Sequence, residues 1–199
     1  MTFLVDLIAM VFAMPRVLFP AVGVLFLGGG AATTGLLSAA FAAGAVLALV
    51  FSGGLVSIRW QAQVISVAII SFGLAVAGFG AVLVWVGDGS PTNVWVVALV
   101  LAMLFLALAG ASDSVSSVFR QTVLQSATPD NMRGRLQGVF IVVVAGGPRL
   151  GDLVLGLESS WIGEAWAAVL GGLTCVILLV AVLAVQRTFL RYDGQNPVP

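Results

Sequence analysis

Long apolar runs separated by short polar or turn-forming segments dominate the chain. No charged residue occurs from 17 to 58, and a cluster of glycine, alanine and threonine at 28–34 divides this stretch in two. Because a bilayer core about 30 Å thick needs about 20 helical residues, the stretch has the length of a hairpin of two membrane-spanning helices. Extended to the whole chain, the pattern predicts six spans, at about 3–27, 33–56, 61–86, 94–118, 136–157 and 164–186.

The composition agrees with a membrane location. The chain is 61% hydrophobic and 8% charged, whereas soluble domains carry roughly 25% charged residues, so most of its surface is expected to face lipid. The net charge is zero, and no basic surface is present for nucleic acid. Histidine is absent and the single cysteine lies in an apolar run. We therefore expect no metal, no cofactor and no enzymatic activity, because the usual acid–base and metal-binding side chains are missing.

The positions of the arginines predict the topology. Every basic residue is an arginine, and those outside the spans fall on one predicted side of the membrane, at Arg59, Arg120, Arg133, Arg135, Arg187 and Arg191. The opposite side would carry only acidic residues, at Asp88, Glu158 and Glu164. By the positive-inside rule, the arginine side and both termini are cytoplasmic. We expect a multi-pass protein of the cell (inner) membrane, with a transmembrane domain at 1–187 and a short cytoplasmic tail at 188–199.

Five charged residues fall inside the first, fourth and fifth spans: Asp6, Arg16, Asp113, Arg149 and Asp152. Each costs a few kcal/mol at membrane depth unless it meets a partner or water, so they are candidates for a substrate cavity or for ion coupling. Arg16 and Arg149 directly follow prolines, and interrupted spans with polar groups are typical of transport sites. Two alternatives stay open. Arg149 and Asp152 have the spacing of a structural ion pair on one helix face, and Asp6 and Asp113 are near enough to the cytoplasmic side to reach the interface.

The stretch from 113 to 138 has the most specific pattern. Its apolar residues follow helical spacing, which predicts that the fourth span continues as an amphipathic helix beyond the membrane. The Thr-Pro-Asp sequence at 128–130 then has the features of a helix start. A gating role is one interpretation of the polar residues here, and fixing the topology is the other. The candidates for a cytoplasmic gating loop are Arg120, Gln121, Gln125, Pro129, Arg133 and Arg135.

The segment VSSVFRQTVLQSATPDNMRGRLQGV resembles the connection between helices ten and eleven of the major facilitator superfamily, most closely an enterobactin-exporter-like subgroup. AMVFAMPRVLFPA and GLLSAAFAAGAVLALVFSGGL resemble its seventh and eighth helices. The strongest signature is the spacing of Gln121, Gln125, Pro129, Arg135 and Gly138. The resemblance implies the C-terminal six-helix half of a twelve-helix fold, built as a three-plus-three repeat. In that fold the first and fourth spans line a central cavity, and the third and sixth are peripheral.

The function we expect is that of a secondary transporter, as a C-terminal half or a truncated form. Proton-coupled export of a small amphipathic molecule, such as a siderophore or drug, follows from the resemblance. The expected partners are the lipid bilayer, the substrate, and either a missing N-terminal six-helix half or a second copy in a homodimer. The alternative is a non-transporting fragment, scaffold or partner subunit. An intramembrane aspartic protease would need Asp6 and Asp113 to face each other, and neither lies in a suitable motif.

Overall fold

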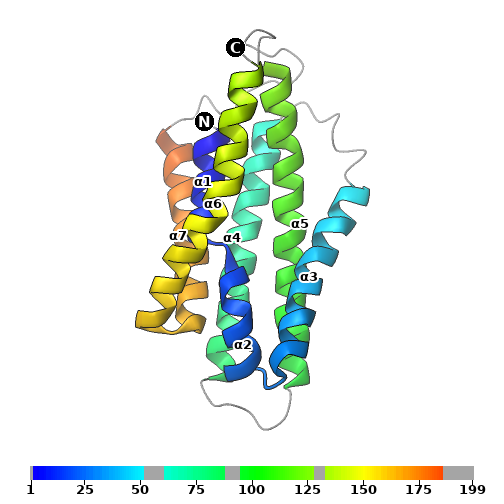
Figure 1. The fold of residues 1–199 in the computed structure, drawn as a ribbon, viewed down its shortest axis with the longest axis vertical. Coiled ribbons are helices and arrows are strands. Elements are labelled where there is room, and N and C mark those ends of the chain that lie inside the picture. The colour runs from blue at the N-terminus through cyan, green and yellow to red at the C-terminus, as the bar shows by residue number, and fades with distance from the viewer. Residues whose placement is uncertain (1, 52–60, 88–94, 128–132, 186–199) are drawn as a thin grey trace.

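A computed structural model describes residues 2–51, 61–87, 95–127 and 133–185, and these residues are helical almost throughout (Figure 1). No strand occurs in these ranges. Six segments are long and apolar enough to cross a membrane, so the predicted all-α fold with six transmembrane helices is confirmed. The elements are α1 (Thr2–Phe12), the 3-10 turn η1 (Pro15–Leu18), α2 (Phe19–Leu25), α3 (Gly30–Phe51), α4 (Gln61–Val86), α5 (Val96–Ala127), α6 (Arg133–Ile162) and α7 (Glu164–Val185).

The first span is broken at its proline, as the sequence predicts. Met14 has an extended backbone, with φ −85° and ψ 98°, which is the conformation that the ring of a following proline favours. Pro15 then begins η1, which separates α1 from α2. The chain after α2 reverses over Gly28 and Gly30, both with positive φ, a backbone conformation that glycine adopts without steric cost. The span therefore bends at membrane depth, and Arg16 lies at the bend.

The interruption that we expect in the fifth span is absent. Pro148 lies inside α6, which runs without a break from Arg133 to Ile162. A proline removes one backbone hydrogen bond, and a membrane helix tolerates this where the freed carbonyl meets another group. Glycines on either side of Pro148 face α1, because a Cβ on Gly147 would lie 2.9 Å from the Met10 sulfur and one on Gly151 would overlap the Met10 carbonyl. Here the Gly-Pro-Arg-Leu-Gly run packs two helices together instead of interrupting one.

The fourth span continues beyond the membrane segment, as predicted. Its apolar stretch ends near Thr122, and α5 extends to Ala127. Three of the residues assigned to a gating loop, Arg120, Gln121 and Gln125, therefore lie on a helix instead. The proposed helix start at 128–130, with Pro129, lies outside the described residues, and α6 begins at Arg133.

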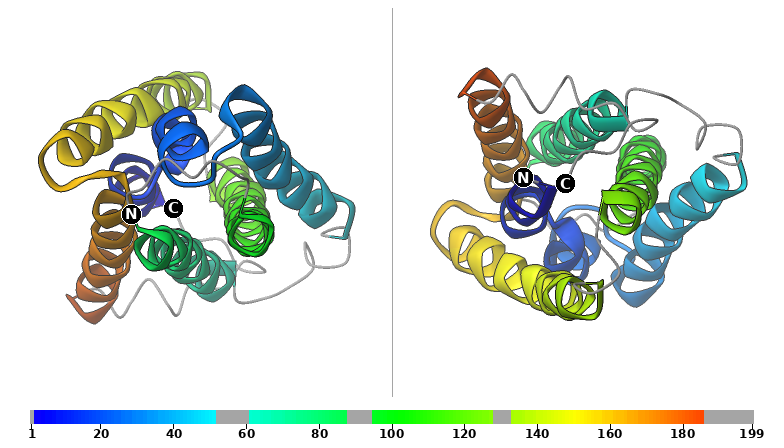
Figure 2. Two further views of the ribbon diagram at one scale, coloured as in Figure 1. Left: turned by 90° about the horizontal axis from the view of Figure 1, so that it is seen from below. Right: turned by 90° about the horizontal axis from the view of Figure 1, so that it is seen from above.

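The helices pack as one bundle around α4 and α5. The principal contacts join α3 to α5, α4 to α5, α4 to α7 and α1 to α6. Figure 2 shows that α6, α2 and α3 lie along one face, whereas α4 and α7 lie along the opposite face. The third span is the most enclosed of the six within this bundle, with 56% of its apolar window buried. The reason is that α4 packs on α5 and α7 with a nearly continuous apolar stripe from Ile65 to Leu83.

Glycines allow the closest helix contacts in the bundle. A Cβ on Gly44 of α3 would overlap the backbone carbonyl of Ala107 in α5, and one on Gly110 of α5 would overlap the carbonyl of Phe41 in α3. The backbones of α4 and α7 touch in the same way at Gly73 and Gly172. Small residues let helix backbones approach closely in lipid, where packing replaces the hydrophobic effect as the driving force.

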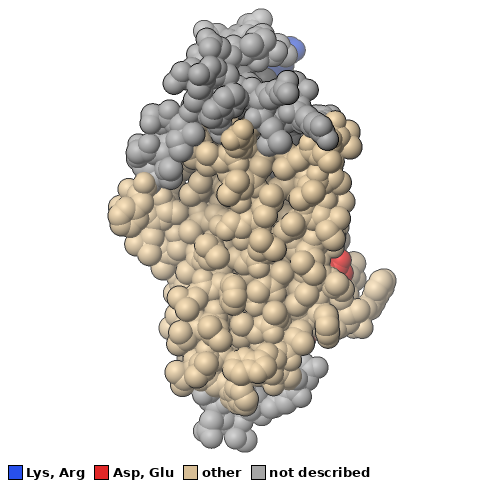
Figure 3. Space-filling model, turned by 180° about the vertical axis from the view of Figure 1, so that it is seen from behind, with Lys and Arg blue, Asp and Glu red and all other residues tan. Residues whose placement is uncertain are grey.

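The faces of the bundle differ in their charge. The face formed by α4, α5 and α7 shows almost no charged side chain among the described residues (Figure 3). Large apolar side chains cover it, including Val67, Leu74, Leu104 and Ile177, each exposed by more than 50%. The charged residues that fall at membrane depth lie mainly on the elements of the other face, α1, η1 and α6. The apolar face is suited to lipid, and the charged one needs water or protein against it.

Candidate functional site

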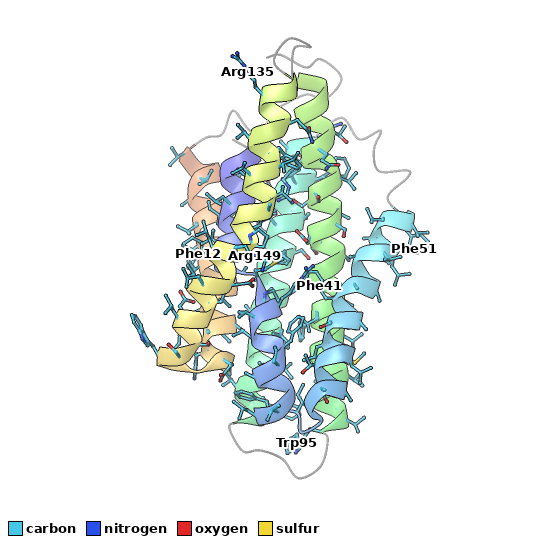
Figure 4. All side chains as sticks on the ribbon, in the orientation of Figure 1. Phe12, Phe41, Phe51, Trp95, Arg135 and Arg149 are labelled. Carbon is cyan, nitrogen blue, oxygen red and sulfur yellow. The ribbon has the colours of Figure 1, made fainter. Side chains whose placement is uncertain are left out.

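Arg16 lies at the bend of the first span and reaches across to α3. Its guanidinium carbon is 4.8 Å from the ring centroid of Phe41, within the range of a cation–π interaction. Arg16 belongs to η1, which begins at Pro15 and separates α1 from α2. Figure 4 shows Phe41 at the middle height of the bundle, between its two ends. Arg16 is exposed in the described part of the chain, so its charge is accessible at membrane depth.

A cavity of about 430 Å³ opens beside this pair, between α2 and α3. Its volume is within the roughly 300–1,000 Å³ typical of small-molecule sites. The residues that line it are Arg16, Phe19, Pro20, Thr34, Ser38, Phe41 and Ala42. Two faces of it are therefore aromatic, and its single charged lining residue is the arginine.

The hydroxyl groups of the cavity already donate to the backbone. Thr34 Oγ1 lies 3.1 Å from the carbonyl oxygen of Gly30, and Ser38 Oγ donates to the carbonyl of Thr34 at 2.9 Å. With their protons engaged, these oxygens have acceptor capacity remaining. Arg16 supplies donors and no acceptor. The cavity therefore suits a molecule with an aromatic or apolar body and with hydroxyl groups, which both donate and accept.

A second charged group lies on α5. Arg120 Nη2 is 3.9 Å from Asp113 Oδ1, two helical turns away along α5, and Asp113 also interacts electrostatically with Arg16. Arg120 is buried, at 4% exposure, whereas about a third of the Asp113 side chain is exposed. The carboxylate of Asp113 thus has two arginines near it, one in the core and one at the cavity. These three residues form the arginine–aspartate cluster.

Arg149 and Asp152 do not form an ion pair within the described range 133–185. The structural pair that their spacing allows is therefore absent between these two described side chains. Arg149 is exposed on α6 and Asp152 is partly exposed. Figure 4 shows Arg149 near the middle height of the bundle. Asp6 lies on α1.

The other candidates lie toward one end of the bundle. Arg135 is exposed near the start of α6, at the end where α5 finishes (Figure 4). Gln121 is exposed on the last turns of α5. Gln125 and Arg133 lie on helices, whereas Pro129 is outside the described residues.

Sequence reasoning missed Phe41, Thr34 and Ser38. Phe41 is one of 12 phenylalanines, and nothing in the local pattern distinguishes it from a residue that packs in the core. Its role follows only from the packing of α3 against the bend at Arg16. Among the described residues, no group of three or more histidine, cysteine or acidic side chains is placed to hold a metal ion.

The fold and this site define a multi-pass α-helical membrane protein that holds charged groups at membrane depth, an arrangement typical of transport proteins. Comparison with known proteins supports the same class of protein. The chain is 29% identical over 183 residues to an enterobactin exporter of Salmonella paratyphi A, a match that covers 92% of this chain and 41% of that relative. It is 28% identical over 184 residues to the enterobactin exporter of Citrobacter koseri, with the same coverage. For the enterobactin exporter of Escherichia coli O81 the identity is 29%, over 90% of this chain and 40% of the relative.

These matches confirm the resemblance to enterobactin exporters of the major facilitator superfamily. The relatives are exporters and not enzymes, in line with the expectation from the sequence. The chain spans about 41% of the length of the curated relatives that it matches. No protein-family profile and no solved structure matches the chain.

Proposed function

We propose that the chain is the C-terminal six-helix part of a proton-coupled exporter of the inner membrane. The observation that carries the proposal is the cavity at Arg16 and Phe41, together with the electrostatic link from Arg16 to Asp113. An exporter needs a substrate site at membrane depth and a nearby group that a proton can neutralise, and the arginine–aspartate cluster combines the two.

The substrate class follows from the cavity. Phe19 and Phe41 provide aromatic surface, the oxygens of Thr34 and Ser38 accept hydrogen bonds, and Arg16 donates them. A small amphipathic molecule with aromatic rings and hydroxyl groups satisfies all of these groups. Enterobactin-like siderophores have this chemistry, and the names of the relatives make enterobactin the first substrate to test.

Proton coupling would act through competition at Asp113. While Asp113 is ionised, its negative charge attracts the guanidinium of Arg16, which lines the cavity. When Asp113 takes up a proton from the outer side, this attraction is lost and Arg16 shifts, so that the substrate loses a hydrogen bond from a charged donor, which is worth about 1.5–3 kcal/mol. Substrate and proton then exclude each other, as antiport requires.

The remaining part of the transporter is proposed to cover the charged face. Arg16 and Arg149 are exposed in the described part of the chain, and leaving charges against lipid costs several kcal/mol each. An N-terminal six-helix half, or a second copy of this chain, would enclose both. Arg120 and Arg135 lie toward one end of the bundle, and the positive-inside rule then makes this end cytoplasmic.

Export from cells tests this function. Cells that lack their own enterobactin exporter would express the full product of the gene, together with any separately encoded half, and enterobactin would be measured in the medium. We expect secretion to rise at least severalfold above that of cells with an empty vector. Secretion that stays at the empty-vector level, with the protein present in the membrane, would favour a non-transporting partner or scaffold instead.

A further inference from the structure

The bundle has a second cavity, which shares no lining residue with the cavity at Arg16 and Phe41. It is a groove of about 520 Å³ between α4 and α5. Apolar side chains make up most of its lining. The lining residues are Gln63, Val64, Val67, Ala68, Ser71, Ala111, Ser112 and Val115. None of them belongs to the site described above.

The groove opens on the exposed apolar surface of α4 and α5. Val67 at its edge is 66% exposed, and farther along the same two helices Leu74, Leu104 and Leu108 are also exposed. Both helices are long and apolar enough to cross a membrane. A groove that is continuous with such a surface lies against hydrocarbon, and lipid has to fill it, because water against an apolar lining is unfavourable.

The few polar groups in the groove do not call for a polar ligand. Ser112 Oγ donates to Ser71 Oγ at 3.0 Å across the α4–α5 contact, so the Ser112 proton is engaged within the protein. Gln63 lies two residues from the start of α4 at Gln61, which places it near the membrane interface. The polar side chain is thus near the interface and the apolar lining lies deeper. A ligand with a polar end at Gln63 and a hydrocarbon tail toward Ser71 and Ala111 fits this arrangement.

We propose that the groove is a specific site for one acyl chain of a phospholipid. The lipid belongs to the leaflet on the side where α4 begins, with its head group level with Gln63 and its chain inserted between Val67 and Val115. The occupied groove would act as a wedge beside the Ser71–Ser112 contact and hold α4 and α5 in the separation seen here. The proposal stands independently of the transport function.

Photo-crosslinking in vesicles tests the proposal. The purified full chain would be reconstituted with phosphatidylethanolamine and phosphatidylglycerol that include a phosphatidylethanolamine with a diazirine on its acyl chain. After illumination, mass spectrometry locates the labelled residues. The depth-matched comparison is Val180 of α7, which is 50% exposed. Its depth is similar to that of Val67, because Gly73 of α4 packs on Gly172 and Val176 of α7.

We expect labelling at Val64, Val67 and Ala111 to exceed that at Val180 at least threefold. Ala111→Phe, which fills the groove, should reduce labelling at Val67 severalfold and leave labelling at Val180 unchanged. Equal labelling at Val67 and Val180 in the unmodified chain would overturn the proposal and indicate ordinary surrounding lipid only. Because the unmodified chain alone decides this comparison, the test does not depend on how well the variant folds.

Discussion

Replacing Arg16 with alanine should reduce export by roughly 10- to 100-fold, because a hydrogen bond to a charged group contributes about 1.5–3 kcal/mol and each 1.4 kcal/mol is a factor of ten. The variant removes the donor of the substrate cavity, the cation above the Phe41 ring and one of the two arginines near Asp113. One substitution therefore removes three interactions. Among the described residues, no other charged side chain lines the cavity.

Two further variants make the Arg16 experiment specific. Arg16→Lys keeps the positive charge but loses the planar, multi-donor guanidinium, so intermediate export is expected. Arg149→Ala removes another exposed arginine that follows a proline, but one with no recorded ion pair among the described residues, so its effect should be smaller. Export would be measured at matched protein levels in the membrane. Unchanged export in Arg16→Ala would remove this residue from the mechanism.

Gly44→Ala should destabilise the bundle although it adds a single methyl group. The added Cβ would overlap the Ala107 carbonyl, so α3 and α5 have to separate. Overpacking of this kind costs typically 1–3 kcal/mol, which corresponds to a decrease in Tm of roughly 2–10 °C for a chain of this size. Thermal unfolding of the purified protein in detergent measures the change.

Gly35→Ala is the matched control for Gly44→Ala. Gly35 lies on the same helix, and a Cβ there meets nothing within 4 Å. Because alanine favours a helix over glycine by about 0.5–1 kcal/mol, Gly35→Ala should leave Tm unchanged or raise it slightly. Equal decreases in Tm for the two variants would show that helix packing at Ala107 is not the cause.

Much of the fold could be predicted because membrane helices follow from length, hydropathy and charge. The break at Pro15 and the extension of α5 to Ala127 also follow from local rules about proline and apolar spacing. At Pro148 the local rule about proline gives the wrong prediction, because α6 continues through it. The same residue pair, Pro-Arg, breaks one span and not the other, because the glycines around Pro148 hold α6 against α1.

The candidate site could be predicted only in part. A charged residue within an apolar segment can be recognised from the sequence alone, so Arg16 and Asp113 could be predicted as candidates. Their electrostatic link and the burial of Arg120 depend on how the helices pack, with α5 held between α3 and α4. Phe41 had no signal of its own, since an aromatic residue in a membrane helix usually contacts lipid or the core. The spacing of Arg149 and Asp152 allowed an ion pair that the structure does not contain.

The dependence of transport on a proton gradient tests the central claim most directly. Inverted membrane vesicles containing the complete transporter would take up radiolabelled enterobactin with and without an acidic interior, for the unmodified protein and for Asp113→Asn. We predict that the acidic interior accelerates uptake severalfold and that a protonophore abolishes this acceleration. In Asp113→Asn the acceleration should be lost, because the amide cannot exchange a proton with the substrate site. Uptake that responds equally to the gradient in both proteins would contradict competition between proton and substrate at Asp113.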